Sequence, residues 1–480
     1  MRDELKEAIH YLTWKGAEYA DIRWVRRAAQ GITVKNGEVE RSTELQDQGF
    51  GIRALVHGAW GFAASAKATK AELKKAANRA LTVAKASASA NGGRVILAEV
   101  EPVVATYRTP IEKDPFTVPL ETKLDLLFRA TDLLQKDPRI RVAEGSLGFF
   151  RTWKVFVSTE GAEIEQEIVE SGGGIVATAV EGDEVQTRSY PASHGGDFAT
   201  KGYEFIEAMD LVGNAERIRE EALALLSADP CPSGEHTVIL DGQQMALQIH
   251  ESCGHAIELD RALGMEMSYA GGSFLSLDKR GGFRYGSPIV NITADATVEG
   301  GLGTFGYDDE GVPAQRTAIV REGVFVDYLK SRETAAVLGD RSNGSMRAES
   351  WNRIPLIRMV NVNLEPGQGT LEELLADTQD GIFISTNKSW SIEQMLLKFQ
   401  FGCEIAWEVK NGRLGRILKN PVYTGITPQF WGSLDAICGP EEWHIWGVPN
   451  CGKGEPPQAA HVGHGTALAR FRRVQVGVKR

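Results

Sequence analysis

The chain has 480 residues, of which 42% are hydrophobic and 24% are charged, as is typical of a globular protein with two or three domains. Its net charge of −11 disfavours contact with phosphates, so no direct nucleic-acid partner is expected. No run approaches the ~18 apolar residues of a spanning helix, and the charged N-terminus is unlike a secretion signal, so we expect no membrane partner and a cytoplasmic location.

The first part of the chain predicts a helix, a β-meander and a second helix. Leu5, Ile9 and Leu12 recur with the spacing of one helical face. The Asn-Gly pair at 36–37 lies between alternating sequences and predicts a tight hairpin turn. The T-x-x-E sequence at 69–72 is a capping box, which indicates the start of the second helix.

The same order of elements is expected again after a proline-containing connector that ends near Pro119. We therefore predict an N-terminal α+β domain over residues 1–228, with two structural repeats at about 1–90 and 119–228. The sequences of the two segments barely match, so the repeat concerns their element order. The elements predicted for the second repeat are a helix over 120–135, strands in RVAEGSLGFF, KVFVST, AEIEQEIVES and GIVATAV, and an amphipathic helix over about 203–226.

The proline- and glycine-rich segment DPCPSG, at 229–234, is the expected domain boundary. Beyond it glycine is dense and strands are frequent, with hairpin turns at 322–323 and 411–412. We predict a β-rich, barrel-like or sandwich-like C-terminal domain over residues 234–480 that carries the chemistry. The predicted fold class is therefore α+β, with an N-terminal α/β part followed by a β-rich catalytic domain.

The sequence QIHESCGHAIE, at 248–258, contains a candidate metal site. His250 and His255 are five positions apart, about 140° around a regular α-helix, so a regular helix cannot direct both imidazoles at one ion. Either a π-bulge or a helix end at Gly254 would bring the rings together. Glu251, next to the first histidine, would then be placed to accept a proton from metal-activated water. The alternative is a helix that carries two unrelated histidines.

A catalytic zinc site needs a third protein ligand. Cys451 lies in a glycine- and proline-rich sequence that we predict to be a loop, and Lys453 nearby would favour its thiolate. The alternative for Cys451 is a small apolar core residue. The candidates for the third ligand are Cys451, His461, His464, Cys403, Cys438 and Glu258.

Two further features could contribute to a site. The acidic residues Asp308, Asp309 and Glu310 in GYDDEGVPAQ could support a ligand histidine or receive a substrate amine, although such a run is more often a solvated turn. His464 could orient substrate or stabilise an oxyanion, although an isolated loop histidine more often does neither.

Four segments together resemble the TldD/PmbA family of metalloproteases. They are HESCGH, GTFGYDDEGVPAQRTAIVREG, IRMVNVNLEPGQGTLEELLADTQDGIFI and NCGKGEPPQAAHVGHGTALARFR. The resemblance is close over the C-terminal half and extends to the layout of the N-terminal half. The family contains an active subunit with H-E-x-x-x-H and a related partner that lacks it, and this chain resembles the active, TldD-like kind.

The resemblance implies zinc bound by His250, His255 and Cys451, with Glu251 as the general base. It also implies a homodimer, or a heterodimer with an inactive paralogue, whose substrates are unfolded or small peptides. Two other functions are considered beside this one. The first is a non-catalytic modulator or binding subunit of a larger assembly. The second is a peptidase with Cys253 or Cys451 as nucleophile and His255 or His464 as base.

Overall fold

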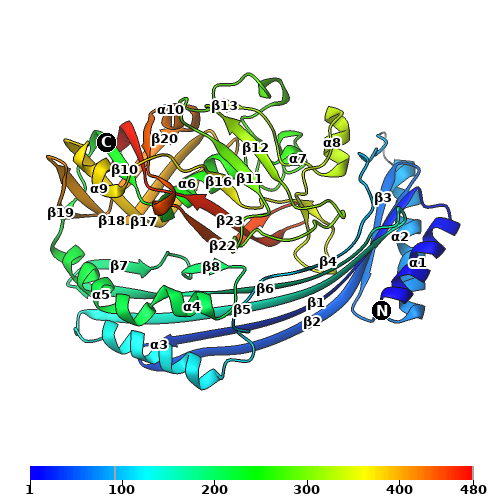
Figure 1. Ribbon diagram of the computed structural model, residues 1–480, viewed down its shortest axis with the longest axis horizontal. Coiled ribbons are helices and arrows are strands. Elements are labelled where there is room, and N and C mark those ends of the chain that lie inside the picture. The colour runs from blue at the N-terminus through cyan, green and yellow to red at the C-terminus, as the bar shows by residue number, and fades with distance from the viewer. Residues whose placement is uncertain (91–92, 478–480) are drawn as a thin grey trace.

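Two eight-stranded sheets form most of the computed structural model, which describes residues 1–90 and 93–477. The first sheet is built from the N-terminal part and lies below the β-rich C-terminal part (Figure 1). The α+β fold class is thus confirmed. Residues 478–480, at the end of the predicted C-terminal domain, lie outside the described residues. Within the described ranges, no helix is long and apolar enough to cross a membrane.

The N-terminal sheet has the strand order β3-β2-β1-β5-β6-β4, with β7 and β8 also paired to β6. Its two halves meet where β1 and β5 pair antiparallel, from Asp21 opposite Ser158 to Lys35 opposite Glu144. The long strands curve beneath the C-terminal part, with β7 and β8 on the side towards it (Figure 1). The strands are β1 (Tyr19–Lys35), β2 (Glu38–Val56), β3 (Ala59–Ser65), β4 (Val104–Arg108), β5 (Ile140–Ser158), β6 (Glu163–Glu181), β7 (Glu184–Tyr190) and β8 (Asp197–Ala199).

Helices pack at both ends of this sheet and bury two separate apolar cores. The segment predicted as the first repeat has the order α1, β1, β2, β3, α2, and the second has the order α3, β5, β6, β7, β8, α4, α5. The single helix predicted over 203–226 is wrong, because Asp210 adopts a left-handed conformation (φ 47°) and ends the first of two helices. Its carboxylate accepts the Gly213 N–H at 3.0 Å and so caps the second helix. The helices are α1 (Arg2–Trp14), α2 (Lys70–Ala90), α3 (Leu120–Leu134), α4 (Glu204–Met209) and α5 (Leu211–Ser227).

Pairing across the sheet joins strands that sequence patterns separate. The strands predicted in RVAEGSLGFF and KVFVST form one strand, β5, and those in AEIEQEIVES and GIVATAV form β6. The connector before Pro119 also contains a strand, β4, which pairs in parallel with β6. The local sequence pattern did not predict that these strands are continuous. Neighbouring strands on both sides form hydrogen bonds with the backbone even at the glycines in the middle of the strands.

The C-terminal sheet has the order β17-β10-β24-β20-β18-β19-β9, and an extra pairing of β17 with β18 closes part of it into a barrel. The barrel-like prediction is therefore confirmed. The three predicted hairpin turns, at 36–37, 322–323 and 411–412, all have positive φ at both residues. The larger strands of this part are β10 (Gly234–Leu240), β17 (Asp380–Ile392), β18 (Lys398–Lys410), β19 (Arg413–Lys419), β20 (Val422–Ile426), β22 (His444–Lys453), β23 (Gln458–Thr466) and β24 (Ala469–Val476).

Smaller elements fill the space around the barrel. A four-stranded sheet has the order β13-β12-β11-β16, and β22 pairs with β23 as a separate hairpin. This hairpin lies between the barrel and the N-terminal sheet (Figure 1). The remaining strands are β9 (Asp229–Pro230), β11 (Ile292–Asp295), β12 (Arg316–Arg321), β13 (Val324–Phe325), β14 (Met346–Arg347), β15 (Leu356–Ile357), β16 (Val362–Leu364) and β21 (Leu434–Ile437). The helices are α6 (Gly242–Ile249), α7 (Leu259–Ala262), α8 (Arg332–Leu338), α9 (Leu371–Ala376) and α10 (Thr427–Gly432).

Candidate metal centre

Helix α6 leads directly into a π-helical turn at 250–254, which carries the first candidate ligand. The N–H of His255 donates to the carbonyl of His250 at 3.2 Å, which is the five-residue spacing of a π-turn. This turn places the two imidazole centroids 5.0 Å apart. Of the two geometries considered for the motif, the π-bulge is therefore the one found. Gly254 is required for packing, since a Cβ there would lie 2.1 Å from the Met359 sulfur.

His250, His255 and Cys451 form a buried cluster that could hold a metal ion. One donor atom from each lies within 4.8 Å of the others, and Cys451 Sγ is 3.6 Å from His255 Nε2. Cys451 lies near the end of β22, so the predicted loop is wrong at this position. β22 pairs with β23 on both sides of a register shift between Val448 and Cys451, and Cys451 lies opposite Ala460. A strand therefore brings the cysteine to the π-turn.

Hydrogen bonds occupy the Nδ1 atoms of both candidate ligand histidines. His464 Nδ1 lies 3.0 Å from the Val362 carbonyl, which can only accept, so this nitrogen carries the proton. His464 Nε2 must then accept from His250 Nδ1, which is 2.8 Å away. His255 Nδ1 donates in the same way to the Glu258 carboxylate at 3.0 Å. These contacts occupy Nδ1 of both rings, so Nε2 is the nitrogen of each ring that could bind a metal ion.

His464 and Glu258 therefore act on the candidate ligands. His464 lies on β23 and is fully buried, and both its ring nitrogens are used, so a direct contact with substrate does not fit it. Burial and the neighbouring His250 hold the pKa of His464 well below its ordinary value, consistent with a neutral ring. Sequence reasoning left the roles of these two residues open.

We expect replacement of His464 with alanine to weaken zinc binding about 10- to 100-fold, as is usual when a partner of a ligand histidine is lost. The measurement is a zinc dissociation constant from competition with a chelating dye. His10→Ala changes an exposed histidine on α1 and is the control, for which no change is expected. An affinity equal to that of the control would mean that His464 does not orient His250.

The Cys451 thiol is set up as a thiolate. Burial alone would raise its pKa, but His250, His255 and Arg358 hold it well below the usual value. Arg358 also donates to the Cys451 carbonyl, a contact without any sequence signal. A thiolate that faces two imidazoles is a donor set that suits zinc.

Lys453 has a different role from the one predicted. Its ammonium group lies 2.7 Å from Asp260 and 3.3 Å from Glu258, rather than next to the thiolate. Burial would raise the pKa of Glu258, but Lys453 and His255 lower it to about 2. The carboxylate that holds His255 is thereby kept ionised.

Glu251 faces a pocket of about 210 Å³ beside the three candidate ligands. Its side chain is 7% exposed. Within residues 1–90 and 93–477 its carboxylate makes neither a side-chain hydrogen bond nor an ion pair, so both oxygens remain available to accept. The pocket is also lined by residues from the β7–β8 loop, α6, β17 and β22, namely Ala192, Ser193, His194, Gly196, Gln243, Ala246, Leu247, Trp390, Trp446, Gly447, Val448, Pro449, Asn450 and Gly452.

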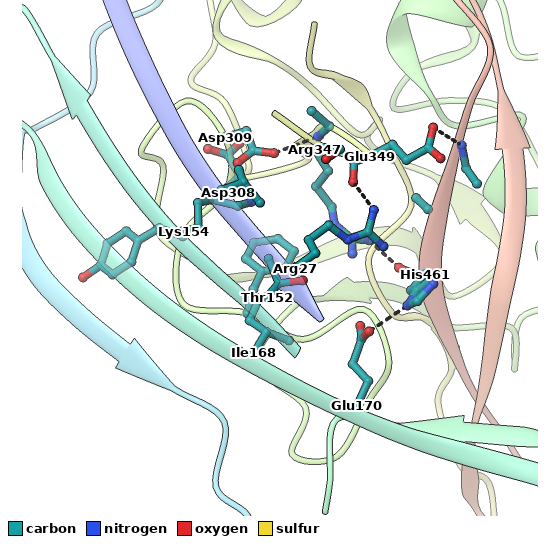
Figure 2. Close-up of a pocket in the computed structure, with 17 residues that line it drawn as sticks. Arg27, Thr152, Lys154, Ile168, Glu170, Asp308, Asp309, Arg347, Glu349 and His461 are labelled. Atoms are coloured by element: carbon teal, nitrogen blue, oxygen red, sulfur yellow. Dashed lines mark hydrogen bonds and ion pairs between the residues drawn. The ribbon is translucent and has the colours of Figure 1, made fainter. Parts of the chain in front are cut away.

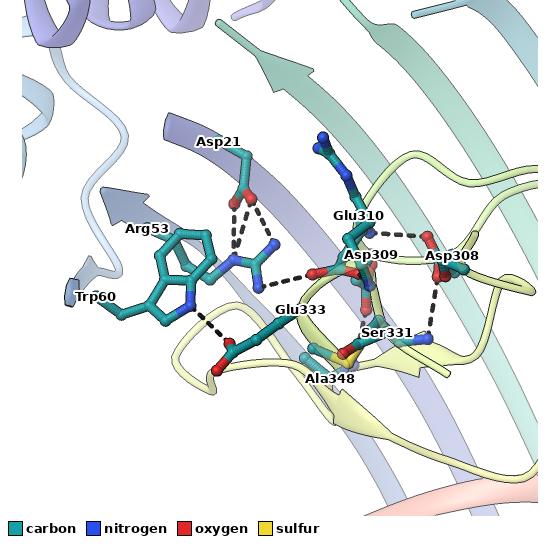
Figure 3. Close-up of polar contacts among 12 residues, drawn as sticks. Asp21, Arg53, Trp60, Asp308, Asp309, Glu310, Ser331, Glu333 and Ala348 are labelled. Atoms are coloured by element: carbon teal, nitrogen blue, oxygen red, sulfur yellow. Dashed lines mark hydrogen bonds and ion pairs between the residues drawn. The ribbon is translucent and has the colours of Figure 1, made fainter. Parts of the chain in front are cut away.

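The acidic run of GYDDEGVPAQ lies elsewhere, and its interpretation as a solvated turn is wrong. Asp308, Asp309 and Glu310 are at most 3% exposed. Arg53 lies between Asp21 and Glu310, and so links β2 of the N-terminal sheet to this run (Figure 3). No hydrogen bond or ion pair among the described residues joins the run to the candidate ligands.

The other two acidic residues complete the same contact between the two parts of the chain. Asp309 pairs with Lys154 at 2.5 Å and with Arg23 at 3.5 Å, both from the N-terminal sheet. Asp308 accepts backbone N–H groups of Glu310, Val312 and Met346 and so shapes the turn. The run therefore fixes the two parts against one another.

We expect Asp309→Asn to lower the free energy of unfolding by about 3–5 kcal/mol, because it leaves Lys154 and Arg23 without their charge partner. Burial alone would raise the pKa of Asp309, but Lys154 and Arg23 hold it below the usual value. The contribution should thus be complete above the unfolded pKa of ~3.9 and disappear as pH falls through the folded one. Urea denaturation measures the free energy of unfolding, with Asp377→Asn, at an exposed aspartate, as the control. Equal losses of stability in the two variants would contradict the prediction.

The remaining candidate ligands lie away from the cluster. His461 pairs with Glu170 of β6 at 2.8 Å, in a second pocket below the β22–β23 hairpin (Figure 2). Cys403 donates to Gln244 at 3.2 Å, and Cys438 packs in the C-terminal core. Burial raises the pKa of Cys253 to about 12, which does not suit a nucleophile.

Family models match three consecutive segments of the chain. They are the PmbA/TldA metallopeptidase domain 1 at residues 20–84, the central domain at 113–226 and the C-terminal domain at 233–477. Together they cover most of the sequence, including all three candidate ligands.

Relatives match over nearly the full length. A metalloprotease of Methanocaldococcus jannaschii is 32% identical, over 94% of this chain and 96% of its own. A protein named zinc metalloprotease TldD homolog, from Saccharolobus solfataricus, is 26% identical over 88% of each chain. Among solved structures, TldE from Thermococcus kodakarensis has a TM-score of 0.74 at 15% identity, over 99% of this chain and 100% of its own, which shows a shared fold.

Proposed function

The chain belongs to the PmbA/TldD family of metallopeptidases, and from this premise we propose that it is a zinc-dependent peptidase of the active, TldD-like kind. Its substrates are unfolded or small peptides. The observation that carries the proposal is the buried set of His250, His255 and Cys451 beside the free carboxylate of Glu251.

The donor set fits zinc. An ion with tetrahedral geometry, about 2.0–2.1 Å from nitrogen and 2.3 Å from sulfur, separates these two atoms by about 3.6 Å. The Sγ of Cys451 and Nε2 of His255 are 3.6 Å apart. The Nδ1 atoms of His250 and His255 are occupied by His464 and Glu258, so the Nε2 atoms would be the ones to bind the ion together with Cys451. When bound there, zinc supplies a Lewis acid that polarises the scissile carbonyl and makes water more acidic.

Glu251 supplies the proton transfers. Its carboxylate takes a proton from the attacking water and then gives it to the nitrogen of the leaving amine as the peptide bond breaks. The absence of a side-chain partner within the described residues supports this role, since a neighbouring Lys or Arg would compete for the same oxygens. Its position directly after His250 keeps it beside the reacting carbonyl.

A binding role without catalysis would not require the free glutamate, and this disfavours a non-catalytic modulator. Family membership extends the proposal to a dimer, either of two copies or with an inactive paralogue. The β22 strand that carries Cys451 then lies in an interior cavity that admits extended peptides rather than folded proteins.

We expect the purified chain to hold about one zinc ion and to cleave an unstructured fluorogenic peptide. Chelation should abolish cleavage because the ligand set is emptied, and added zinc should restore it. Metal analysis and peptide kinetics before and after chelation measure both effects. Cleavage that survives complete metal removal would favour a cysteine nucleophile. A chain with neither metal nor cleavage would favour the modulator.

A further inference from the structure

The loop between β7 and β8, residues 191–196, brings the N-terminal part of the chain to the pocket beside Glu251. Ser193 lines this pocket and is 7% exposed. Among the described residues its Oγ has no hydrogen-bond partner. Leaving a buried hydroxyl unpaired is unfavourable, so the atom is suited to a ligand that enters the pocket.

The β7–β8 loop is held in place at both ends. Beyond it, Asp197 accepts from the Gly447 N–H at 2.8 Å and so ties the loop to β22. Before it, Ser189 donates to Glu404 at 2.7 Å. Gly196 permits close approach to the sheet, since a Cβ there would lie 1.8 Å from the Gly173 carbonyl oxygen. Ser193 is therefore presented on a preorganised segment.

An aromatic wall faces the same pocket. Trp390 is 45% exposed, although an indole of this size is usually covered. His194 packs edge-on against it at 5.3 Å and contacts the Asn387 amide oxygen at 3.2 Å. Trp446 lines the pocket from β22, and its indole N–H also lacks a partner among the described residues. Apolar atoms with a few unpaired donors are the usual lining of a ligand site.

We propose that the β7–β8 loop, Trp390 and Trp446 form a subsite that takes an apolar peptide side chain, with the Ser193 hydroxyl bound to the substrate main chain. This inference rests on the proposed function and adds to it a preference for peptides with apolar side chains. The indoles supply the apolar contact area, and a peptide carbonyl satisfies the buried hydroxyl. The N-terminal part thus takes part in substrate binding while the ligands and Glu251 come from the C-terminal part.

The test measures binding separately from cleavage, in the full-length chain with Glu251→Ala. Two fluorescein-labelled unstructured peptides are titrated, one rich in Leu and Phe and one rich in Gly and Ser. Ser193→Ala should weaken the binding of both about 3- to 10-fold. Trp390→Ala should weaken only the apolar peptide, by about 10-fold, and Trp390→Phe should retain most of the affinity.

Matched controls come from the same chain. Ser171→Ala removes another buried hydroxyl without a partner among the described residues, and Trp14→Ala removes an exposed indole, and neither residue lines the pocket. Affinities of the Ser193 and Trp390 variants equal to those of the controls would overturn the subsite, even if the wild-type chain cleaves peptides. Failure of the Glu251→Ala chain to bind either peptide would overturn it as well. Failure of the proposed function appears instead as cleavage that survives Glu251→Ala or chelation.

Discussion

Replacing Glu251 with glutamine is expected to abolish peptide cleavage while the metal stays bound. Glutamine keeps the shape of the side chain but cannot take a proton from water, and the loss of a general base costs about 10²- to 10⁴-fold in kcat. Glu251 itself is not one of the three clustered donors, so the zinc content should not change. Single-turnover cleavage of a fluorogenic peptide and metal analysis of the same preparation measure both quantities.

Glu372→Gln is the control for this change, because Glu372 is exposed on α9, away from the pocket. Its rate should equal that of the wild-type chain. Cleavage by the Glu251→Gln chain at more than a tenth of the wild-type rate would contradict the proposed mechanism. A chain that loses its zinc would show that Glu251 has a structural role in the site.

Replacing Cys451 with alanine is expected to remove both the metal and the activity. Only two of the three clustered donors remain, and zinc held by two imidazoles should be lost during purification. The drop in zinc affinity should exceed the ~10- to 100-fold that changes around a ligand cause. Metal analysis of the variant beside the wild-type chain tests the third ligand directly.

Cys438→Ala is a matched control, since Cys438 is also buried and free but does not belong to the donor cluster of His250, His255 and Cys451. It should keep one zinc per chain and normal cleavage. Full zinc content in Cys451→Ala would place the third ligand elsewhere. Retained zinc without cleavage would point instead to Cys451 as the nucleophile.

Much of the metal centre could be predicted from local sequence. The five-residue spacing of His250 and His255 demands a distorted or ended helix, and the π-turn meets that demand. Glycine at 254 is compatible with both geometries, so the sequence did not choose between them, and its packing against Met359 involves a residue more than a hundred positions away. The third donor could not be derived from spacing, because β22 is brought to α6 by the fold and not by the neighbouring sequence.

The acidic run was misinterpreted because distant partners bury it. The acidic run at 308–310 has the composition of a solvated turn, but Arg23, Arg53 and Lys154 from the N-terminal sheet make its burial favourable. Ser193 and Trp390 had no sequence signal, because a pocket wall built from two parts of the chain has no local pattern.

The distance along the chain between the candidate ligands has a consequence for biosynthesis. His255 and Cys451 are 196 positions apart, so the set is complete only when the chain has been made through β22 and this strand has docked. Under the proposed function, a growing chain of this enzyme is itself an unfolded peptide of the kind that it cleaves. Because the zinc site forms only after β22 has docked, a newly made chain would become an active peptidase only once it has folded and is no longer an unfolded substrate.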